Sequence, residues 1–366
     1  MELSEPRKQW PLYHATYTVF VALLSVLVFC LFLSIPGING YERAMFGDMV
    51  YGKAYKPFVY RTLLPTTVRV LTSAIPSPVK ARLTDALSTN PTLAQVADMQ
   101  EWEREYLVEY CIASVLMYAA LLGFLFSLKY LFSAVLRAPP PFADLIPPLA
   151  LVGLPIFFKY YSYLYDLPTL LFFTLGLALM ARRNWRAYLV LYPIACLNKE
   201  TTILLALIFA IHFASPQRMS RHLFTRLLAF QLVVFLVIKT ALALLFRHNP
   251  GNLVEVYLDR NITLLMPYTI SRVATWLVFA MAVFTNWPDK PGLLKDALWI
   301  AVPLWLLAWL FGNLDELRAF YEVYPIIILL MAHTFAGLLG VRIERVHIPP
   351  AAQSTAPAQA EQSGER

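Results

Sequence analysis

The chain has 366 residues, of which 59% are hydrophobic and only 14% are charged, with a formal net charge of +7. About a quarter of the residues in a typical soluble domain are charged, so this composition excludes an ordinary soluble enzyme. Repeated apolar stretches of about 20 residues indicate an all-α polytopic membrane protein. The modest basic excess is typical of cytoplasmic loops and does not indicate a nucleic-acid partner.

The first hydrophobic segment covers residues 17–35. It is longer than the apolar region of a signal peptide, and it ends in Ser-Ile-Pro-Gly-Ile rather than in a small-residue cleavage pattern. We therefore expect a retained first transmembrane helix. In chain order, the candidate spans are 17–35, 107–128, 146–160, 167–181, 187–197, 201–214, 226–246, 268–286, 297–311 and 325–340.

Basic residues fall in alternate short loops, which the positive-inside rule assigns to the cytoplasm. They are Arg7, Lys8, Lys129, Arg137, Arg182, Arg183, Arg186, Arg218, Arg221, Lys290 and Lys295, with Arg342 and Arg345 after the last span. This pattern predicts an inner (cytoplasmic) membrane protein with both termini in the cytoplasm.

Segment 187–197 is too short to cross a bilayer alone, because a helix rises about 1.5 Å per residue. If it were merged with 201–214 into one helix, Arg218 and Arg221 would move to the exterior. We therefore expect two segments that meet at Asn198-Lys199-Glu200 and dip into the membrane inside the bundle.

The first exterior loop, residues 36–106, belongs to a single transmembrane domain of residues 1–345. After Pro65, a favourable first helical residue, positions 68, 70, 71, 74 and 75 are apolar and positions 66, 69, 72 and 73 are polar. This partition predicts a helix lying in the membrane interface. A second, polar helix is expected over 92–106. The Ala/Gln/Ser/Pro-rich tail, residues 346–366, is expected to be a disordered cytoplasmic segment.

No Cys/His spacing predicts a zinc site: the six histidines are scattered, and Cys30, Cys111 and Cys196 lie in apolar segments where they pack as small hydrophobes. Ionisable residues instead gather in the predicted exterior loops. They are Glu42, Arg43, Asp48, Lys56, Arg61, Lys159, Asp166, Lys199, Glu200, Arg247, Asp259, Arg260, Asp315, Glu316, Arg318 and Glu322. Because ionisable groups near the membrane are functional candidates, this asymmetry predicts one exterior site.

Several of these residues also have purely structural interpretations. The tyrosines of "KYYSYLYD" (159–166) are typical of an interfacial aromatic belt, and Asp166 could cap a helix N-terminus. The group Glu316, Arg318 and Glu322 could form a salt-bridge network in a loop. Asp48 differs because a basic, aromatic run and the predicted interfacial helix follow it directly.

The chain resembles the GT-C class of integral membrane glycosyltransferases over most of residues 10–340. The matching features are Asp48 in the first exterior loop, the interfacial helices there and about ten hydrophobic segments. The stretch "YDLPTLLFFTLGLALMARRNWRAYLVLYPIACLNKETTILL" (165–205) resembles the Tyr-Asp and Asn-Lys/Arg-Glu-Thr pattern of bacterial membrane proteins near that class. The stretch "ELRAFYEVYP" (316–325) resembles their late exterior loop.

This resemblance implies a sugar donor on a polyprenyl phosphate and an inverting transfer to a glycan, lipid or protein acceptor on the periplasmic side. Asp48 is the expected base, with Glu42 as the second candidate. The expected phosphate partners are Lys56, Arg61, Lys199, Arg260 and Arg318. The residues expected to orient the sugar or the cations are Tyr55, Tyr165, Asp166, Glu200, Glu316, Tyr321 and Glu322. The resemblance leaves open whether a divalent cation takes part, and no metal ligand is predicted.

Three other function classes stay open. One is a different membrane enzyme that polymerises or ligates lipid-linked glycans, which would use similar cations without Asp48 as base. A secondary transporter or flippase would use broken helices near the midplane, which Lys199, Glu200 and Lys239 favour, although no internal repeat is evident. A non-catalytic membrane scaffold would tolerate substitution of the exterior charges.

Overall fold

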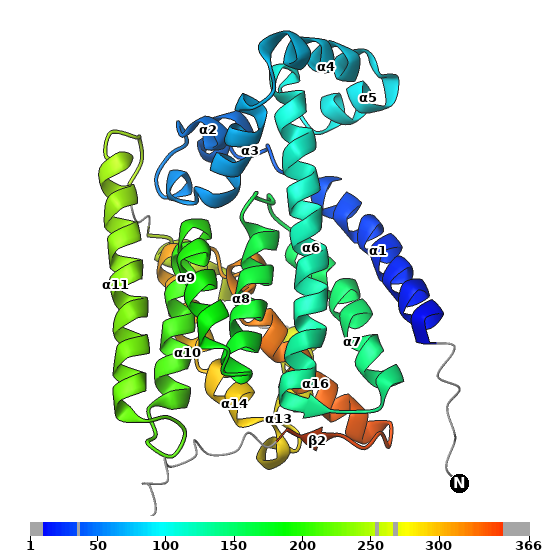
Figure 1. The fold of residues 1–366 in the computed structure, drawn as a ribbon, viewed down its shortest axis with the longest axis vertical. Helices are drawn as coiled ribbons and strands as arrows, with labels where there is room; N and C mark the ends of the chain where they lie inside the picture. The colour runs from blue at the N-terminus through cyan, green and yellow to red at the C-terminus, as the bar shows by residue number, and fades with distance from the viewer. Residues whose placement is uncertain (1–9, 35–36, 253–255, 266–269, 347–366) are drawn as a thin grey trace, which may run out of the picture.

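The computed structural model describes residues 10–34, 37–252, 256–265 and 270–346, and these are almost entirely helical (Figure 1). Each of the ten expected spans overlaps one or two helices of the described residues. Among the described residues, five helical stretches are long and apolar enough to cross a membrane: Leu12–Ser34, Arg104–Val135, Pro140–Phe157, Arg221–Leu245 and Gly292–Phe311. Membrane helices satisfy their backbone hydrogen bonds internally, so apolar sequence of this length favours them.

The bundle is built from eleven α-helices with short 3-10 turns between some of them. They are α1 (Trp10–Ser34), α6 (Leu107–Val135), α7 (Pro140–Gly153), α8 (Asp166–Ala181), α9 (Trp185–Asn198), α10 (Ile203–Phe213), α11 (Arg221–Leu245), α13 (Ile270–Phe284), α14 (Gly292–Leu298), α15 (Ala301–Phe311) and α16 (Tyr324–Leu338). The 3-10 turns of this part are η4 (Leu154–Phe157), η5 (Glu200–Thr202), η6 (Trp287–Asp289) and η7 (Leu317–Phe320).

The most extensive helix contact joins α6 and α8, at the centre of the bundle (Figure 1). Gly123 of α6 faces Leu171, and a Cβ added at Gly123 would lie 3.0 Å from the Leu171 side chain. Small residues at such positions let membrane helices approach closely. The end of α6 continues into β1 (Leu136–Arg137), which pairs antiparallel with β2 (Glu344–Arg345), so that Leu136 faces Arg345.

The predicted break between the segments 187–197 and 201–214 is confirmed. α9 ends at Asn198, and η5 leads into α10. Trp185 at the start of α9 packs edge-on against Phe213 at the end of α10, with 5.2 Å between the ring centroids. The two helices therefore run antiparallel, and the turn at Lys199 and Glu200 lies at the opposite end from Trp185.

Residues 37–106 form a small helical cap over one end of the bundle, at the top of Figure 1, which we call the loop end. Its elements are η1 (Glu42–Ala44), α2 (Phe46–Tyr51), η2 (Phe58–Tyr60), α3 (Leu63–Ser73), α4 (Ser77–Thr89), α5 (Pro91–Met99) and η3 (Arg104–Tyr106). The short helix α12 (Leu258–Leu265) is amphipathic in composition and packs against α15.

Two expectations for this cap are wrong in detail. The interfacial helix α3 begins at Leu63, two residues before Pro65, and its buried face includes the polar Thr72, whereas Val70 is 60% exposed. Thr72 is accommodated because its hydroxyl donates to the carbonyl of Val68 at 2.8 Å. The expected single helix over 92–106 ends at Met99, because Glu101 adopts a left-handed conformation with φ 53°.

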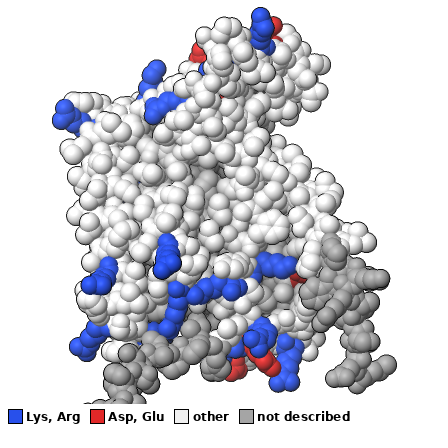
Figure 2. Space-filling view, in the orientation of Figure 1, with Lys and Arg blue, Asp and Glu red and all other residues white. Residues whose placement is uncertain are grey.

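Lysine and arginine gather in a band at the opposite end of the bundle, which we call the basic end (Figure 2). Arg183 of this end donates to the carbonyl of Arg218 at 2.9 Å and so joins two of the basic loops. The face in Figure 2 shows few acidic residues there, as the positive-inside rule predicts for a cytoplasmic surface. The predicted disordered tail, residues 346–366, lies outside the described residues from 347 onward.

The orientation can be tested with single cysteines at the two ends. Thr89 at the loop end and Gln217 at the basic end are both exposed. If the basic end faces the cytoplasm, Thr89→Cys in intact cells reacts with a membrane-impermeant maleimide, and Gln217→Cys reacts only after permeabilisation. The wild-type protein, with its native Cys30, Cys111 and Cys196, measures the background. The reverse labelling pattern would mean that the assigned orientation is inverted.

Candidate functional site

The turn between α9 and α10 is held by side chains from both neighbouring helices. Asn198 donates from Nδ2 to the carbonyl of Tyr165 at 3.1 Å and to Oγ1 of Thr169 at 2.9 Å. Lys239 of α11 donates to the carbonyl of Cys196 at 2.7 Å. These bonds satisfy carbonyls and side chains that the end of a helix would otherwise leave unpaired. They also explain why Lys239 points into the bundle.

Glu200, in this turn, forms a two-point ion pair with Arg61 of the cap. Arg61 donates from Nη2 to Oε1 at 2.5 Å and from Nε to Oε2 at 3.2 Å. The Arg61 guanidinium also lies over the ring of Tyr165, 4.1 Å from its centroid. Two parallel hydrogen bonds plus a cation–π contact fix the position of the guanidinium.

Lys199 points into the bundle and pairs with Glu322, two residues before the start of α16. The distance from Lys199 Nζ to Glu322 Oε1 is 2.9 Å, and the Glu322 side chain is 0% exposed. The hydroxyl of Thr201 donates to the same carboxylate oxygen. A buried charge needs such compensation, because removal from water is expensive.

Arg318 brings the late loop into the same region. Its guanidinium lies 4.0 Å from the ring centroid of Tyr163, and it forms an ion pair with Glu316. Its Nη1 is 4.0 Å from Oδ2 of Asp166. That Asp166 oxygen accepts from the backbone N–H of Tyr163 at 2.9 Å, so Asp166 does not cap the following turn of α8.

These contacts define one cluster from four segments far apart in the sequence, which we call the Arg61–Arg318 cluster. It contains the cations Arg61, Lys199 and Arg318 and the acids Asp166, Glu200, Glu316 and Glu322, with Tyr163 and Tyr165 between them. Arg318 Nη1, Glu322 Oε2 and Asn198 Oδ1 are buried and lack a hydrogen-bond partner among the described residues. Such buried atoms have hydrogen-bonding capacity that a ligand or water could use.

Asp48 belongs to a different group of side chains. It lies in α2 and is partly buried, and its charge acts on Glu103 and on the hydroxyl of Tyr106. Burial, with a smaller contribution from Asp48, raises the pKa of Glu103. Among the described residues, no cation of the Arg61–Arg318 cluster forms an ion pair with Asp48. Glu42, the second candidate base, is exposed in η1.

Four other predicted site residues lie outside the cluster. Lys56 donates to the carbonyl of Arg247 at 3.4 Å, and Tyr55 lies under Arg43. Arg260 is exposed on α12, where its charge acts on Tyr160. Tyr321 is 1% exposed and stacks on Phe157 with a centroid distance of 5.0 Å, so it packs the core instead of offering a surface for a sugar ring.

The sequence alone did not single out Tyr163, Thr201 or Glu103. The sequence pattern of Tyr163 is typical of an interfacial aromatic belt. In the structure its ring stacks on that of Tyr165, two residues later, with 5.2 Å between the ring centroids. Glu103 falls in the polar helix expected over 92–106. Only the structure shows that it lies beside α2, where a Cβ added at Gly47 would lie 2.4 Å from the Tyr106 ring and 3.2 Å from the Glu103 carboxylate.

Each carboxylate of the cluster faces an arginine or lysine, so a divalent cation would have to break an ion pair to bind there, and each cation is likewise paired with a carboxylate. The described residues contain no group of three or more His, Cys, Asp or Glu arranged to hold a metal ion. Comparisons with protein-family models, with curated proteins and with solved structures found no match. The geometry of this chain is therefore the basis for inferring its function.

The buried pair of Lys199 and Glu322 can be tested by a double-mutant cycle. Lys199→Met or Glu322→Leu alone leaves a buried charge unpaired and is expected to destabilise the protein by about 3–5 kcal/mol. The double variant should recover part of that loss, which thermal unfolding of the detergent-purified protein measures. Lys159→Met, which breaks the exposed pair with Asp315, should change stability by less than about 1 kcal/mol. Strictly additive losses would show that the pair is not coupled.

Proposed function

We propose that the protein is a membrane glycosyltransferase that moves a sugar from a polyprenyl-phosphate donor to an acceptor at the loop end. The observation that carries this proposal is the Arg61–Arg318 cluster. It places two guanidinium groups and an ammonium group beneath a helical cap, where the headgroup of a membrane lipid arrives. Arginine can bind phosphate through two hydrogen bonds, which suits it to a diphosphate or phosphate leaving group.

An apolar groove beside the cluster supports a lipid-linked donor. The groove has a volume of about 360 Å³ and runs between α3 and the end of α9, lined by Thr62, Leu63, Thr66, Thr67, Val70, Leu71 and Leu197. Thr62 directly follows Arg61, and Leu197 lies three residues before Glu200. An isoprenoid chain in this groove would bury apolar surface while its phosphate reached Arg61.

The chemistry requires one base and a stabilised leaving group. The base takes the proton of an acceptor hydroxyl as its oxygen attacks the anomeric carbon of the sugar. The bond from that carbon to the phosphate oxygen breaks, and the phosphate leaves with the electron pair, stabilised by cations. Asp48 is the proposed base. Burial raises the pKa of its neighbour Glu103.

In this proposal the cluster binds the phosphate of the donor, and α2 carries Asp48, the base that takes the proton of the acceptor hydroxyl. Arg61 links them along the chain, because η2 connects α2 to α3 and packs against η1. The sugar would therefore lie between the cluster and the cap. The acceptor is a glycan, lipid or protein, and the positive-inside rule puts the reaction on the exterior side of the inner membrane.

The base assignment is tested with Asp48→Asn in membrane vesicles supplied with polyprenyl-phosphate-linked sugars. Loss of the base should lower the transfer rate by at least about 100-fold, with donor binding retained because the arginines are intact. Asp289→Asn, an exposed acid at the basic end, serves as the matched control and should transfer at the wild-type rate. Full transfer by a correctly inserted Asp48→Asn variant would remove Asp48 as the base.

The phosphate assignment is tested by Arg61→Lys and Arg318→Lys, which keep the charge but lose the planar two-point grip. Each should lower donor consumption by about 10- to 100-fold, the equivalent of about 1.5–3 kcal/mol for charge-assisted hydrogen bonds. Arg82→Lys, at an exposed position of α4, controls for the substitution itself. Unchanged donor consumption in both cluster variants would argue against phosphate binding at this cluster.

A secondary transporter or flippase is the second candidate, and the helix break at Lys199 with Lys239 donating into it favours that function. Uptake or flipping of a lipid-linked or small anionic solute by proteoliposomes separates the two. A transferase consumes donor and moves no solute, whereas a transporter moves solute and leaves the donor intact.

A further inference from the structure

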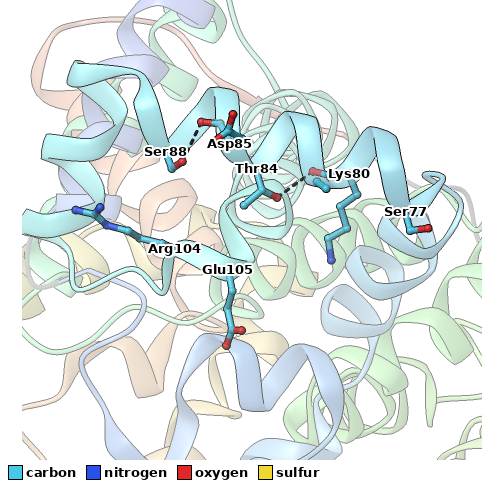
Figure 3. A pocket seen from close by; sticks show the side chains of 8 residues that line it. Ser77, Lys80, Thr84, Asp85, Ser88, Arg104 and Glu105 are labelled. Atoms are coloured by element: carbon cyan, nitrogen blue, oxygen red, sulfur yellow. Dashed lines mark hydrogen bonds between the residues drawn. The ribbon is translucent and has the colours of Figure 1, made fainter.

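The cap contains a polar cleft that the proposed transfer chemistry leaves unassigned. It has a volume of about 630 Å³, lies between α4 and the segment that begins η3, and is shown in Figure 3. Its lining is almost entirely polar: Ser77, Lys80, Ala81, Thr84, Asp85, Ser88, Arg104 and Glu105. Its volume falls in the range of small-molecule sites, but its lining lacks the large apolar side chains that a lipid or an aromatic ligand requires.

The two cations of this cleft are already compensated by carboxylates outside it. Lys80 donates to the buried carboxylate of Glu109 at 2.6 Å. Arg104 donates to both carboxylate oxygens of Asp98, the shorter distance being 2.9 Å. An added anion such as phosphate would therefore have to displace an existing partner.

Two of the three hydroxyl groups of the lining already donate. Thr84 donates to the carbonyl of Lys80 at 3.0 Å, and Ser88 donates to the carbonyl of Asp85 at 2.9 Å (Figure 3). Their oxygens keep free lone pairs, and the exposed carboxylates of Asp85 and Glu105 can only accept hydrogen bonds when ionised. The cleft thus offers these acceptors beside the remaining N–H donors of Lys80 and Arg104, which suits a hydroxyl-rich ligand that both donates and accepts hydrogen bonds.

The back of the cleft is connected to the helix that carries Asp48. Glu109, beneath Lys80, also accepts from the hydroxyl of Tyr51 at 2.6 Å, and Tyr51 is the last residue of α2. The charges of Glu105 and Asp48 both act on the hydroxyl of Tyr106. The cleft and α2 are therefore linked through Glu109 and Tyr106.

We propose that this cleft binds a neutral, hydroxyl-rich carbohydrate, which is the acceptor of the transfer. The identity of the ligand as acceptor rests on the proposed transferase function, whereas carbohydrate binding rests on the cleft alone. The charge balance of the cleft supports a neutral ligand, because its two cations are already paired with carboxylates and its hydroxyl and carboxylate oxygens can accept hydrogen bonds from hydroxyl groups. Glu105 connects the bound sugar to the surroundings of Asp48.

The test is binding of neutral oligosaccharides to the full-length, detergent-purified protein without any donor, followed by saturation-transfer NMR. The probes are maltotriose, mannobiose and N,N′-diacetylchitobiose, with sodium phosphate and spermidine as competitors. At least one oligosaccharide should bind saturably. Asp85→Ala combined with Glu105→Gln should weaken binding by at least 10-fold. Ala81→Trp, which fills the cleft from an exposed position, should abolish it.

Arg82→Gln, an exposed residue of the same helix outside the lining, is the matched control and should bind like the wild type. Three results would overturn the proposal. None of the three oligosaccharides binds, the cleft variants bind as tightly as the wild type, or spermidine displaces the sugar from the same site. If an oligosaccharide binds in the cleft and yet the wild-type protein consumes no lipid-linked donor, the transferase function fails while the carbohydrate site stands.

Discussion

The buried ion pair of Lys199 and Glu322 is the interaction on which the loop end depends. It joins the turn between α9 and α10 to the start of α16, two points 123 residues apart. A charge as buried as Glu322 is tolerated only when a partner and a hydrogen-bond donor accompany it, and Thr201 supplies the second. Because the pair fixes the turn, it also fixes Glu200, and through Glu200 it fixes Arg61 of the cap.

The cluster built on this pair leaves two buried polar atoms, Arg318 Nη1 and Glu322 Oε2, without hydrogen-bond partners among the described residues. Its two guanidinium groups are held over tyrosine rings. Each also pairs with a carboxylate, which an incoming phosphate would have to displace. Glu200, whose side chain is 41% exposed, is the acid of the cluster that solvent and ligands reach most easily.

The loop end holds two groups of polar side chains where a single exterior site was expected. The Arg61–Arg318 cluster, with three cations and four carboxylates, lies where the cap meets the bundle, beside an apolar groove. The second group lines the cleft between α4 and η3 and has two cations, two carboxylates and three hydroxyl groups. Asp48 lies next to Glu103, the residue that precedes η3. This arrangement suits a reaction between a phosphate-bearing partner from the membrane and a hydroxyl-bearing partner from outside it.

The sequence by itself determined the membrane class, the positions of the apolar helices, the break at Lys199 and the crowding of charge at one end. These properties depend on local composition, helix length and loop charge, which follow directly from the amino-acid sequence. Only the tertiary structure decided that Arg61 faces Glu200, that Lys199 faces Glu322, that Asp48 neighbours Glu103 and that Tyr321 packs in the core. Those outcomes depend on the rotation of each helix and on contacts between distant segments, because burial and packing, and not residue type, determine which charges become partners.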